Sequence, residues 1–325
     1  MYPTLPKYQT KNRVCRGEFD SYRFLPHPDI TKPALTSFEL PIPYSLFPIP
    51  HSLQMTNSDF NYIRQLVRDR TGVVLSEDKQ YLVESRLMGL AKQIGANSVK
   101  SLVAQLQQKP FHPLCQSVVE AMMTTETFFF RDDNPFQALK NVILPELIQQ
   151  RQTERHLTIW CAACSSGQEP YSIAMLLREH FPELTTWNVQ LIASDISDVM
   201  LNRARSGYYH PHEINRGLPL NLRQKYFEAK GQGWTIKPDI RQMVEFRPIN
   251  LTETVLPLSQ VDIIFLRNVL IYFDIETKQE ILARLRRVLQ PNGYLFLGGG
   301  ETTVNLDHAF EPVQFDKAVC YRLRG

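Results

Sequence analysis

Apolar residues recur at helical spacing between residues 56 and 123. N-cap residues occupy positions 56–59, and the apolar positions after them predict a first helix that ends at Gly72. Its apolar face is formed by Phe60, Ile63, Leu66 and Val67. Three further helices are predicted over residues 76–95, 101–108 and 113–123. Together they predict an all-helical domain of about 70 residues, which is small but large enough to fold.

After Arg131 the pattern changes to short apolar runs that alternate with helical stretches. Candidate strands cover residues 157–162, 189–194, 244–246, 261–266, 294–297 and 318–323. Candidate helices cover residues 135–150, 170–180, 197–206 and 275–289. Because strands that alternate with helices form parallel sheets covered on both faces, the predicted fold class is α/β with a mostly parallel sheet.

Residues 1–52 show neither the helical nor the strand periodicity of apolar residues. Nine of the 22 prolines lie within the first 50 residues, which predicts an extended, proline-rich segment. Aromatic residues in this segment leave open whether parts of it dock on the body of the protein or stay free. The predicted domains are therefore the extension over 1–52, a helical domain over 53–125 and an α/β domain over 126–325.

Composition narrows the class of protein. Hydrophobic residues make up 43% and charged residues 21% of the chain, as in soluble globular proteins. A net charge of +3 is too small for a protein that binds nucleic acid chiefly through phosphate contacts. No apolar run approaches the roughly 20 residues that span a bilayer, and the N-terminus lacks the pattern of a secretory signal. We therefore expect a cytoplasmic protein with no nucleic-acid partner and no membrane insertion. We also expect a monomer.

Five cysteines are too few and too scattered for a disulfide framework in a chain of 325 residues. Cys161 and Cys164 have the CxxC spacing of a zinc half-site or a redox motif. Because no second CxxC or HxxxH follows, we favour the interpretation that they are small residues at the end of a strand. We predict no metal site.

The first junction between a strand and a helix, at residues 160–174, is rich in small residues. Such a turn lets a ligand approach the backbone closely, and Pro170 suits the first turn of the next helix. The layout is typical of nucleotide sites, although Gly167 alone does not make the dinucleotide motif GxGxxG. A plain tight connection explains the turn equally well.

Two later strand ends carry polar residues. Asp195 ends the second strand, where a carboxylate accepts hydrogen bonds from the ribose hydroxyls of an adenosine cofactor. It also fits as the N-cap of the helix that begins near Ser197, and both roles are compatible. The fourth strand is followed by Arg267, Asn268 and Tyr272, which face the ligand crevice by topology. Alternatively, Arg267 or Asn268 caps backbone carbonyls, and Tyr272 is a core aromatic residue.

Several longer motifs resemble those of the CheR methyltransferases. They are residues 124–131 (similar to T-x-N-E-T-x-F-F-R), 162–174 (A-x-S-x-G-E-E-P-Y-S-I-A), 193–196 (A-[ST]-D-I), 204–209 (A-R-x-G-x-Y), 250–251 (N-L) and 265–273 (F-x-R-N-V-x-I-Y-F). The resemblance covers about residues 56–323, and several motifs in the family's order are far more specific than one alone. Two positions depart from the family: Thr125 stands where Asn is usual, and Gln168 replaces the first of two acidic residues.

The resemblance implies a Rossmann-like methyltransferase domain that binds S-adenosylmethionine and releases S-adenosylhomocysteine. Carried over by position, cofactor contacts are expected at Thr125, Thr127, Arg131, Glu169, Asp195, Asn250, Leu251, Arg267 and Asn268. Arg131 and Tyr272 are expected at the methyl-transfer centre as catalytic residues. The implied reaction is esterification of glutamate side chains on the cytoplasmic helical domain of chemoreceptors. A same-fold methyltransferase with another substrate and a non-catalytic scaffold are the alternatives.

Two further expectations accompany the resemblance. A small antiparallel subdomain is expected near residues 231–246, with a hairpin that pairs 234–237 with 243–246. Because this hairpin is short, we expect it not to bind a tethering peptide of the receptor. Basic residues of the helical domain either dock on an acidic receptor surface or form a solvated face with the interspersed acidic residues. These basic residues are Arg64, Arg68, Arg70, Lys79, Arg86 and Lys92.

Overall fold

The computed structural model of the chain describes residues 54–108 and 113–324. The extension predicted over residues 1–52 lies outside the described residues, and so does Cys15. Within the described part, no helix combines the length and the apolar character that are needed to cross a membrane.

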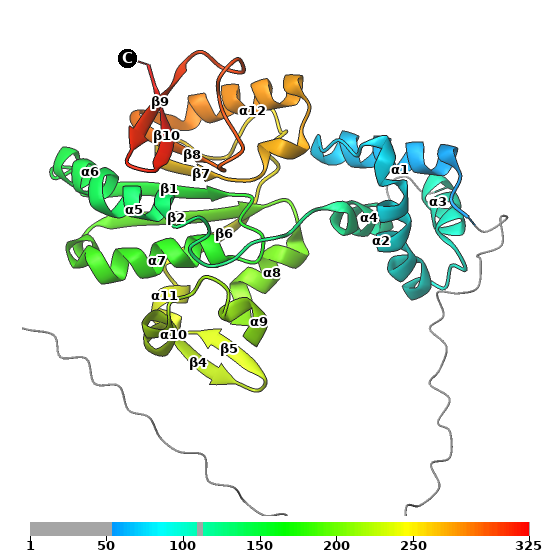
Figure 1. Cartoon of the computed structure of the whole chain (residues 1–325), viewed down its shortest axis with the longest axis horizontal. Helices are drawn as coiled ribbons and strands as arrows, with labels where there is room; N and C mark the ends of the chain where they lie inside the picture. The colour runs from blue at the N-terminus through cyan, green and yellow to red at the C-terminus, as the bar shows by residue number, and fades with distance from the viewer. Residues whose placement is uncertain (1–53, 109–112, 325) are drawn as a thin grey trace, which may run out of the picture. The chain divides into compact units, whose positions relative to one another are not determined.

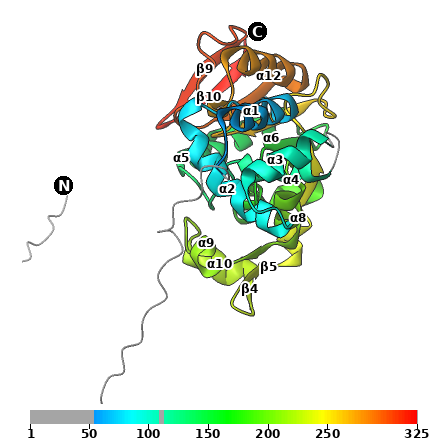
Figure 2. The ribbon, with the colours of Figure 1, turned by 90° about the vertical axis from the view of Figure 1, so that its right-hand side faces the viewer.

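The helical domain has the predicted helices. They are α1 (Asn57–Thr71), α2 (Gln80–Gln93), α3 (Val99–Gln108) and α4 (Pro113–Met122), with a 3₁₀ turn, η3 (Glu77–Lys79), before α2. Figures 1 and 2 show these helices gathered in one group. Thr56 and Asp59 form a capping box that starts α1, and Gly72 follows its end with a left-handed φ of 73°. The predicted apolar residues Phe60 and Ile63 are buried in a cluster to which all of these α-helices contribute.

The rest of the chain forms an α/β domain around a seven-stranded sheet. Its helices include α5 (Asn134–Ala138), α6 (Leu144–Gln150), α7 (Gln168–His180), α8 (Asp198–Ser206) and α12 (Ile275–Val288), and a π-helical segment, η4 (Leu139–Ile143), joins α5 to α6. Its strands are β1 (His156–Ala162), β2 (Asn188–Asp195), β6 (Val244–Pro248), β7 (Val261–Leu266), β8 (Leu289–Leu297), β9 (Phe310–Phe315) and β10 (Ala318–Leu323). Short 3₁₀ turns, η5 (Pro182–Thr186) and η6 (Leu270–Tyr272), precede β2 and α12. The predicted fold class, α/β after a small helical domain, is confirmed.

The sheet has the strand order β6-β2-β1-β7-β8-β10-β9. Strands β6, β2, β1, β7 and β8 run parallel, and β10 is antiparallel to both of its neighbours (Figure 1). Side chains alternate along β1: Ile159 and Cys161 join the apolar cluster with α5 to α7, whereas Trp160 and Ala162 join the cluster with α12. Helices thus cover both faces, which explains why the inner strands are nearly continuous apolar runs.

A second, three-stranded antiparallel sheet lies between α8 and β6 in the sequence. It consists of β3 (Tyr208–Tyr209), β4 (Phe227–Lys230) and β5 (Gly233–Ile236), accompanied by α9 (Pro211–Ile214), α10 (Leu220–Tyr226) and α11 (Pro238–Arg241). The predicted pairing of residues 234–237 with 243–246 is wrong, because Pro238 begins α11 and Val244 begins an edge strand of the main sheet. The observed hairpin joins β4 to β5 at Gly231. The argument from hairpin length against a tethering peptide therefore loses its basis.

Strand β9 is the one strand of the main sheet that the sequence pattern missed. It is an edge strand, and only Phe310 is fully buried along it. It therefore lacks the continuous apolar run of the inner strands. Pro312 is tolerated there because a residue on an edge strand does not need to donate on both sides.

The segment after α1 contacts the loops that follow β6 and β7. The N–H of Val74 donates to the carbonyl oxygen of Tyr272 at 2.9 Å. A Cβ atom at Gly72 would lie 2.7 Å from Cγ2 of Thr252, so only glycine permits this approach without a shift. The helical domain therefore lies directly against the strand ends at which the site is predicted.

Candidate functional site

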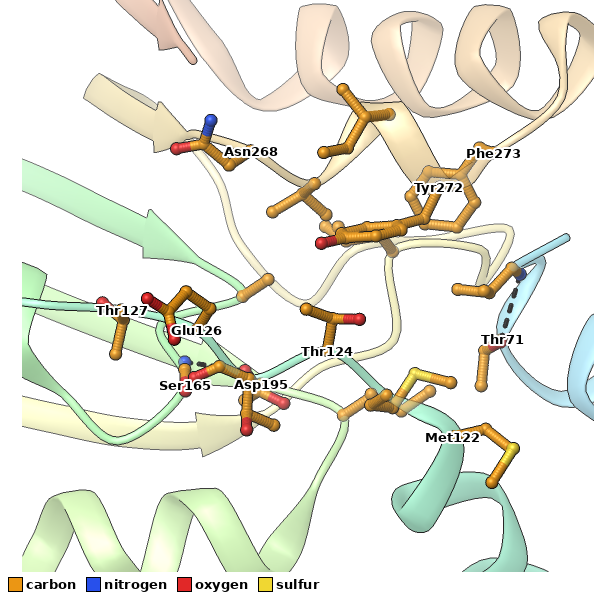
Figure 3. Close-up of a pocket in the computed structure, with 18 of the residues that line it drawn as sticks. Thr71, Met122, Thr124, Glu126, Thr127, Ser165, Asp195, Asn268, Tyr272 and Phe273 are labelled. Carbon is orange, nitrogen blue, oxygen red and sulfur yellow. Dashed lines mark hydrogen bonds between the residues drawn. The ribbon is translucent and has the colours of Figure 1, made fainter. Parts of the chain in front are cut away.

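A pocket of about 390 Å³ lies at the carboxyl ends of β1, β2 and β7 (Figure 3). Its volume is within the usual range of cofactor sites. All residues predicted for cofactor binding and catalysis line this pocket: Thr125, Thr127, Arg131, Glu169, Asp195, Asn250, Leu251, Arg267, Asn268 and Tyr272. Thr71 and residues 73–76 of the helical domain also line it. The structure thus gathers positions that are far apart in the sequence.

Asp195 joins the ends of β1 and β2. Its Oδ2 accepts the backbone N–H of Ser165 at 2.8 Å (Figure 3), and its Oδ1 accepts that of Ser197 at 2.9 Å. The N-cap of α8 is Ser197, whose hydroxyl accepts from Met200, so the alternative that Asp195 itself is the N-cap is wrong. Burial raises the pKa of Asp195, and the backbone hydrogen bonds oppose this rise. Each carboxylate oxygen retains a lone pair for a ligand donor such as a ribose hydroxyl.

The turn between β1 and α7 passes close to α8. Gly167 adopts a φ of 91°, and a Cβ atom there would lie 2.9 Å from Cβ of Ala204. Cys161 and Cys164 are buried free thiols, and burial raises the pKa of both well above the ordinary range. Neither thiol is therefore poised for redox chemistry.

Arg267 is a buried cation at the end of β7. Its side chain is only 2% exposed, yet it donates to Oε2 of Glu169 at 2.9 Å and to Oδ2 of Asp132 at 2.7 Å. It also donates to the carbonyl oxygen of Arg131 at 2.8 Å. Burial raises the pKa of Glu169, and the charge of Arg267 opposes this rise. Arg267 therefore does more than cap a carbonyl, because it ties β7 to α7 and to the segment before α5.

Asn268 has a left-handed backbone with a φ of 59°. Its Oδ1 is buried and has no hydrogen-bond partner within the described residues, although the residue lines the pocket. Its backbone N–H donates to Oε2 of Glu301 at 2.7 Å. The sequence reading missed Glu301, and the available signal was an acidic residue directly after the glycines that follow β8.

The segment over residues 124–131 forms one wall of the pocket. Ser165 donates its hydroxyl to the carbonyl oxygen of Thr125 at 2.8 Å. Glu126 pairs with Arg216, whose guanidinium also lies 4.3 Å from the ring centroid of Phe128. Arg131 donates to the carbonyl oxygen of Glu126 at 3.1 Å. A hydrogen bond from Arg131 to the backbone of Glu126 and the contacts of Arg216, which follows α9, thus hold this wall in place.

Tyr272 lies in η6 and is only half-buried. Figure 3 shows its hydroxyl turned into the pocket, on the side facing Thr124. A core aromatic residue would point the other way, so the alternative of a purely structural ring is not supported.

Asn250 departs from the expected pattern. Its Nδ2 donates to the carbonyl oxygen of Arg70 at 2.9 Å, while its Oδ1 accepts from the backbone N–H and the hydroxyl of Thr252. The amide therefore links the helical domain to the loop after β6, and protein partners occupy it. The adjacent Leu251 is buried and supplies apolar surface to the pocket.

The residues of the pocket fit S-adenosylmethionine. The cofactor carries hydroxyl and ammonium donors, and the pocket offers the carboxylates of Glu169 and Asp195 together with the unpaired Oδ1 of Asn268. It also carries a positive sulfonium, which carboxylates favour electrostatically. The donor and acceptor chemistry therefore agrees with this cofactor.

The predicted basic face of the helical domain is largely engaged within the protein. Arg64 donates to the carbonyl oxygen of Leu75, Arg86 to that of Met122, and Arg68 pairs with Asp274 at 2.7 Å. Lys79 pairs with Asp78. Among the basic residues predicted for docking, the side chains that form no ion pair or hydrogen bond in the described part are Arg70 and Lys92.

Comparison with known proteins matches both domains to one family. Residues 58–123 match the family described as CheR methyltransferase, all-alpha domain, and residues 125–319 match CheR methyltransferase, SAM binding domain. The chain is 43% identical over 273 residues to "Chemotaxis protein methyltransferase Cher2" of Pseudomonas putida, covering 82% of this chain and 98% of that protein. It is 44% identical to "Chemotaxis protein methyltransferase 1" of Pseudomonas aeruginosa, covering 84% of this chain and 100% of that protein. A Vibrio cholerae protein of the same name is 37% identical, covering 84% of this chain and 99% of the relative.

These matches extend over both domains and most of each relative, and they agree with the helical domain, the parallel sheet and the pocket. The cofactor of the matched domain is the one that the pocket chemistry fits. The chain therefore belongs to the CheR family of S-adenosylmethionine-dependent methyltransferases.

Proposed function

We propose that this protein transfers a methyl group from S-adenosylmethionine to glutamate side chains of chemoreceptors, which gives glutamate methyl esters. The observation that carries this proposal is the pocket, which gathers every residue position transferred from the family. The names of the relatives, chemotaxis protein methyltransferases, support the substrate class.

The chemistry of the pocket favours a carboxylate as the methyl acceptor. A glutamate side chain has a reference pKa near 4.3 and is already ionised at neutral pH, so its methylation requires no general base. No histidine is among the described residues that line the pocket. The carboxylates of Glu169 and Asp195 are held by hydrogen bonds from protein groups. A hydroxyl acceptor would instead have to give its proton to a carboxylate of this lining, and Glu126, Glu169 and Asp195 are each already held by protein donors.

The work of the protein is then mainly alignment. S-adenosylmethionine supplies the activated methyl group, and holding the acceptor oxygen in line with it accounts for about 7–11 kcal/mol of barrier reduction in well-oriented reactions. Arg131 lies at the pocket with a permanently charged guanidinium that binds and orients the acceptor carboxylate. Tyr272 donates its hydroxyl near the acceptor as a positioning group rather than a base.

Other residues of the same pocket hold the cofactor. Asp195 accepts from the ribose hydroxyls, because its oxygens face the pocket while backbone N–H groups fix their position. Glu169, in the first turn of α7, and Arg267 and Asn268, after β7, line the pocket and bind the amino-acid portion of S-adenosylmethionine. Thr125 and Thr127 of the wall over residues 124–131, and Leu251 in the loop after β6, contribute the remaining cofactor contacts.

The partner in this proposal is the cytoplasmic helical domain of a chemoreceptor. Arg70 and Lys92 of the helical domain are exposed and form no ion pair or hydrogen bond among residues 54–108 and 113–324, so they are the candidates for contact with an acidic receptor surface. Complementary charge of this kind raises the association rate more than the affinity. Cations that already bind within the protein, such as Arg86, contribute less to docking.

One assay tests the function directly. The full chain is incubated with labelled S-adenosylmethionine and receptor-containing membranes, and the receptor band is tested for methyl label that base releases. Base-labile label on wild-type receptor, absent from receptor whose methylation-region glutamates are changed to alanine, is the expected result. Label that resists base would indicate another acceptor atom, and no label despite cofactor binding would indicate a non-catalytic scaffold.

A further inference from the structure

One carboxylate outside the pocket gathers the backbone of the turn after β7. Oε2 of Glu301 accepts the N–H of Gly298 at 2.6 Å and that of Asn268 at 2.7 Å. Oε1 accepts the N–H of Val269 at 2.8 Å and that of Ile271 at 3.3 Å. An ionised carboxylate has about four acceptor sites, so the hydrogen-bonding capacity of this side chain is fully used by the protein.

These bonds explain the shape of the turn. At Asn268 the backbone leaves the extended conformation of β7 for a left-handed one, and its N–H and that of Val269 then converge on the same side chain. Gly298 allows the close approach, since a Cβ atom there would lie 2.8 Å from Oε2 of Glu301 and 2.5 Å from Nδ2 of Asn268. Within β7, backbone N–H groups donate to the neighbouring strands. After β7, the N–H groups of Asn268 and Val269 donate to the carboxylate of Glu301 instead.

We propose that Glu301 is a positioning residue for methyl transfer, acting through the turn over residues 267–272. It does not line the pocket, but the turn it binds carries Asn268 and Tyr272, which do. With the N–H groups of Asn268, Val269 and Ile271 held, the amide of Asn268 and the ring of Tyr272 keep their places beside the cofactor and the acceptor. The roles of those two residues rest on the proposed function, whereas the hold of Glu301 on the turn does not.

The chain offers a matched control at the opposite end of the same strand. Asp262 is 1% exposed, accepts the backbone N–H of Thr158 at 2.8 Å and pairs with Arg151 at 3.0 Å. It is therefore a buried, structurally important carboxylate that does not line the pocket. If Glu301 served stability alone, substitutions at Glu301 and at Asp262 would have similar effects on methyl transfer.

The test compares Glu301→Gln with Asp262→Asn in the full chain. Glutamine has one carbonyl oxygen and points its NH₂ donors at backbone donors, so at least two of the hydrogen bonds are lost. Hydrogen exchange of the amides of residues 268, 269 and 271 should become faster in Glu301→Gln while exchange in β1 stays unchanged. S-adenosylhomocysteine affinity should fall about 10-fold and kcat about 100-fold, with little change in KM for the receptor, as expected of a small misplacement. Asp262→Asn should lower the Tm but leave kcat within about 2-fold.

Unchanged exchange in residues 268–271, or a fall in kcat no larger than that of Asp262→Asn, would overturn the proposal. If Glu301→Gln does not fold, Gly298→Ala supplies the second test, because its Cβ atom would displace the amide of Asn268 and should give the same pattern in milder form. If the wild-type protein methylates no receptor, the proposed function fails, but exchange and S-adenosylhomocysteine affinity still decide the role of Glu301.

Discussion

The strand ends of β2 and β7 form two sides of one pocket, but their polar groups differ in how the protein satisfies them. At β2 both oxygens of Asp195 accept a backbone N–H. At β7 the buried Oδ1 of Asn268 and Nε of Arg267 have no partner within the described residues. A buried unsatisfied polar group costs about 1–3 kcal/mol, so a ligand that donates to Oδ1 of Asn268 would offset part of the cost at the end of β7.

The difference suggests a division of roles between the two strand ends. At the end of β2, backbone N–H groups already fix both oxygens of Asp195, so this carboxylate is a rigid hydrogen-bond acceptor. At the end of β7, the buried cation Arg267 pairs with Glu169 and Asp132. The side-chain oxygen of Asn268 there has no donor among the described residues. Substitutions at the two ends should therefore separate effects on stability from effects on ligand affinity.

The largest effect is expected from Arg267→Met. Removal of the cation leaves the carboxylate of Glu169 buried without its charge partner, and breaking a buried pair in this way costs about 3–5 kcal/mol. Urea unfolding should show this loss of free energy. Arg247→Met is the matched control, because Arg247 pairs with Glu245 at an exposed site and such pairs contribute about 0–1 kcal/mol. Equal losses for both variants would contradict the buried-pair argument.

Asp195→Ala should rank second. If the carboxylate accepts from two ribose hydroxyls, S-adenosylhomocysteine affinity falls by about 1–3 kcal/mol, measured by calorimetry. Stability should also fall, because the N–H groups of Ser165 and Ser197 lose their acceptor. Asp198→Ala removes an exposed carboxylate at the start of the adjacent helix and should leave affinity unchanged. Unaltered affinity in Asp195→Ala would remove this residue from the cofactor site.

A smaller effect is expected from Asn268→Gly. Glycine suits the left-handed backbone, so the free energy of unfolding should change by less than about 1 kcal/mol. Loss of the acceptor Oδ1 should lower S-adenosylhomocysteine affinity by about 1 kcal/mol. Asn305→Gly provides the control, because Asn305 has a φ of 60° but does not line the pocket. If both variants bind the ligand like wild type, the unpaired Oδ1 does not serve the cofactor.

The sequence anticipated the features that depend on neighbours along the chain. The period of apolar residues predicted the inner strands because both faces of each are buried, as at Ile159 and Trp160 of β1. The position of Asp195 followed from the topology of parallel sheets. The same topology placed Arg267, Asn268 and Tyr272 at the ligand crevice. The other site residues came from the resemblance to the family, since Thr127 or Asn250 has no local signature that marks it as a ligand residue.

The features that the sequence missed depend on contacts between distant residues. Glu301 binds Asn268 across 33 positions, and Asn250 binds the carbonyl of Arg70 across 180. Neither pairing has a local pattern. The hairpin was misplaced because the alternation of apolar residues over 243–246 fits a strand in either the small antiparallel sheet or the main sheet. These residues join the main sheet because they pair with the free edge of β2.

The smallest effect concerns the dependence of stability on pH. Burial raises the pKa of Asp195 above its ordinary value of 3.8 and hydrogen bonds only partly oppose this rise, so the native state binds protons more tightly there than the unfolded state. The stability that this group contributes is present below pH 3.8 and is lost as pH rises through the raised pKa. Asp195→Asn should therefore flatten the decline of unfolding free energy over that window, without abolishing it, because the pKa of Glu169 is also raised by burial.

Asp274 supplies the control of opposite sign. Hydrogen bonds from the side chain and the backbone N–H of Thr277 lower its pKa, so its contribution is present above pH 3.8 and is lost only as pH falls through the lowered value. Asp274→Asn should therefore reduce stability by a constant amount across the window in which Asp195→Asn changes the slope. Urea unfolding of the three proteins at a series of pH values measures both effects. Parallel curves for Asp195→Asn and wild type would mean that Asp195 titrates alike in the folded and unfolded chains, and that the strand end of β2 is more hydrated than its burial indicates.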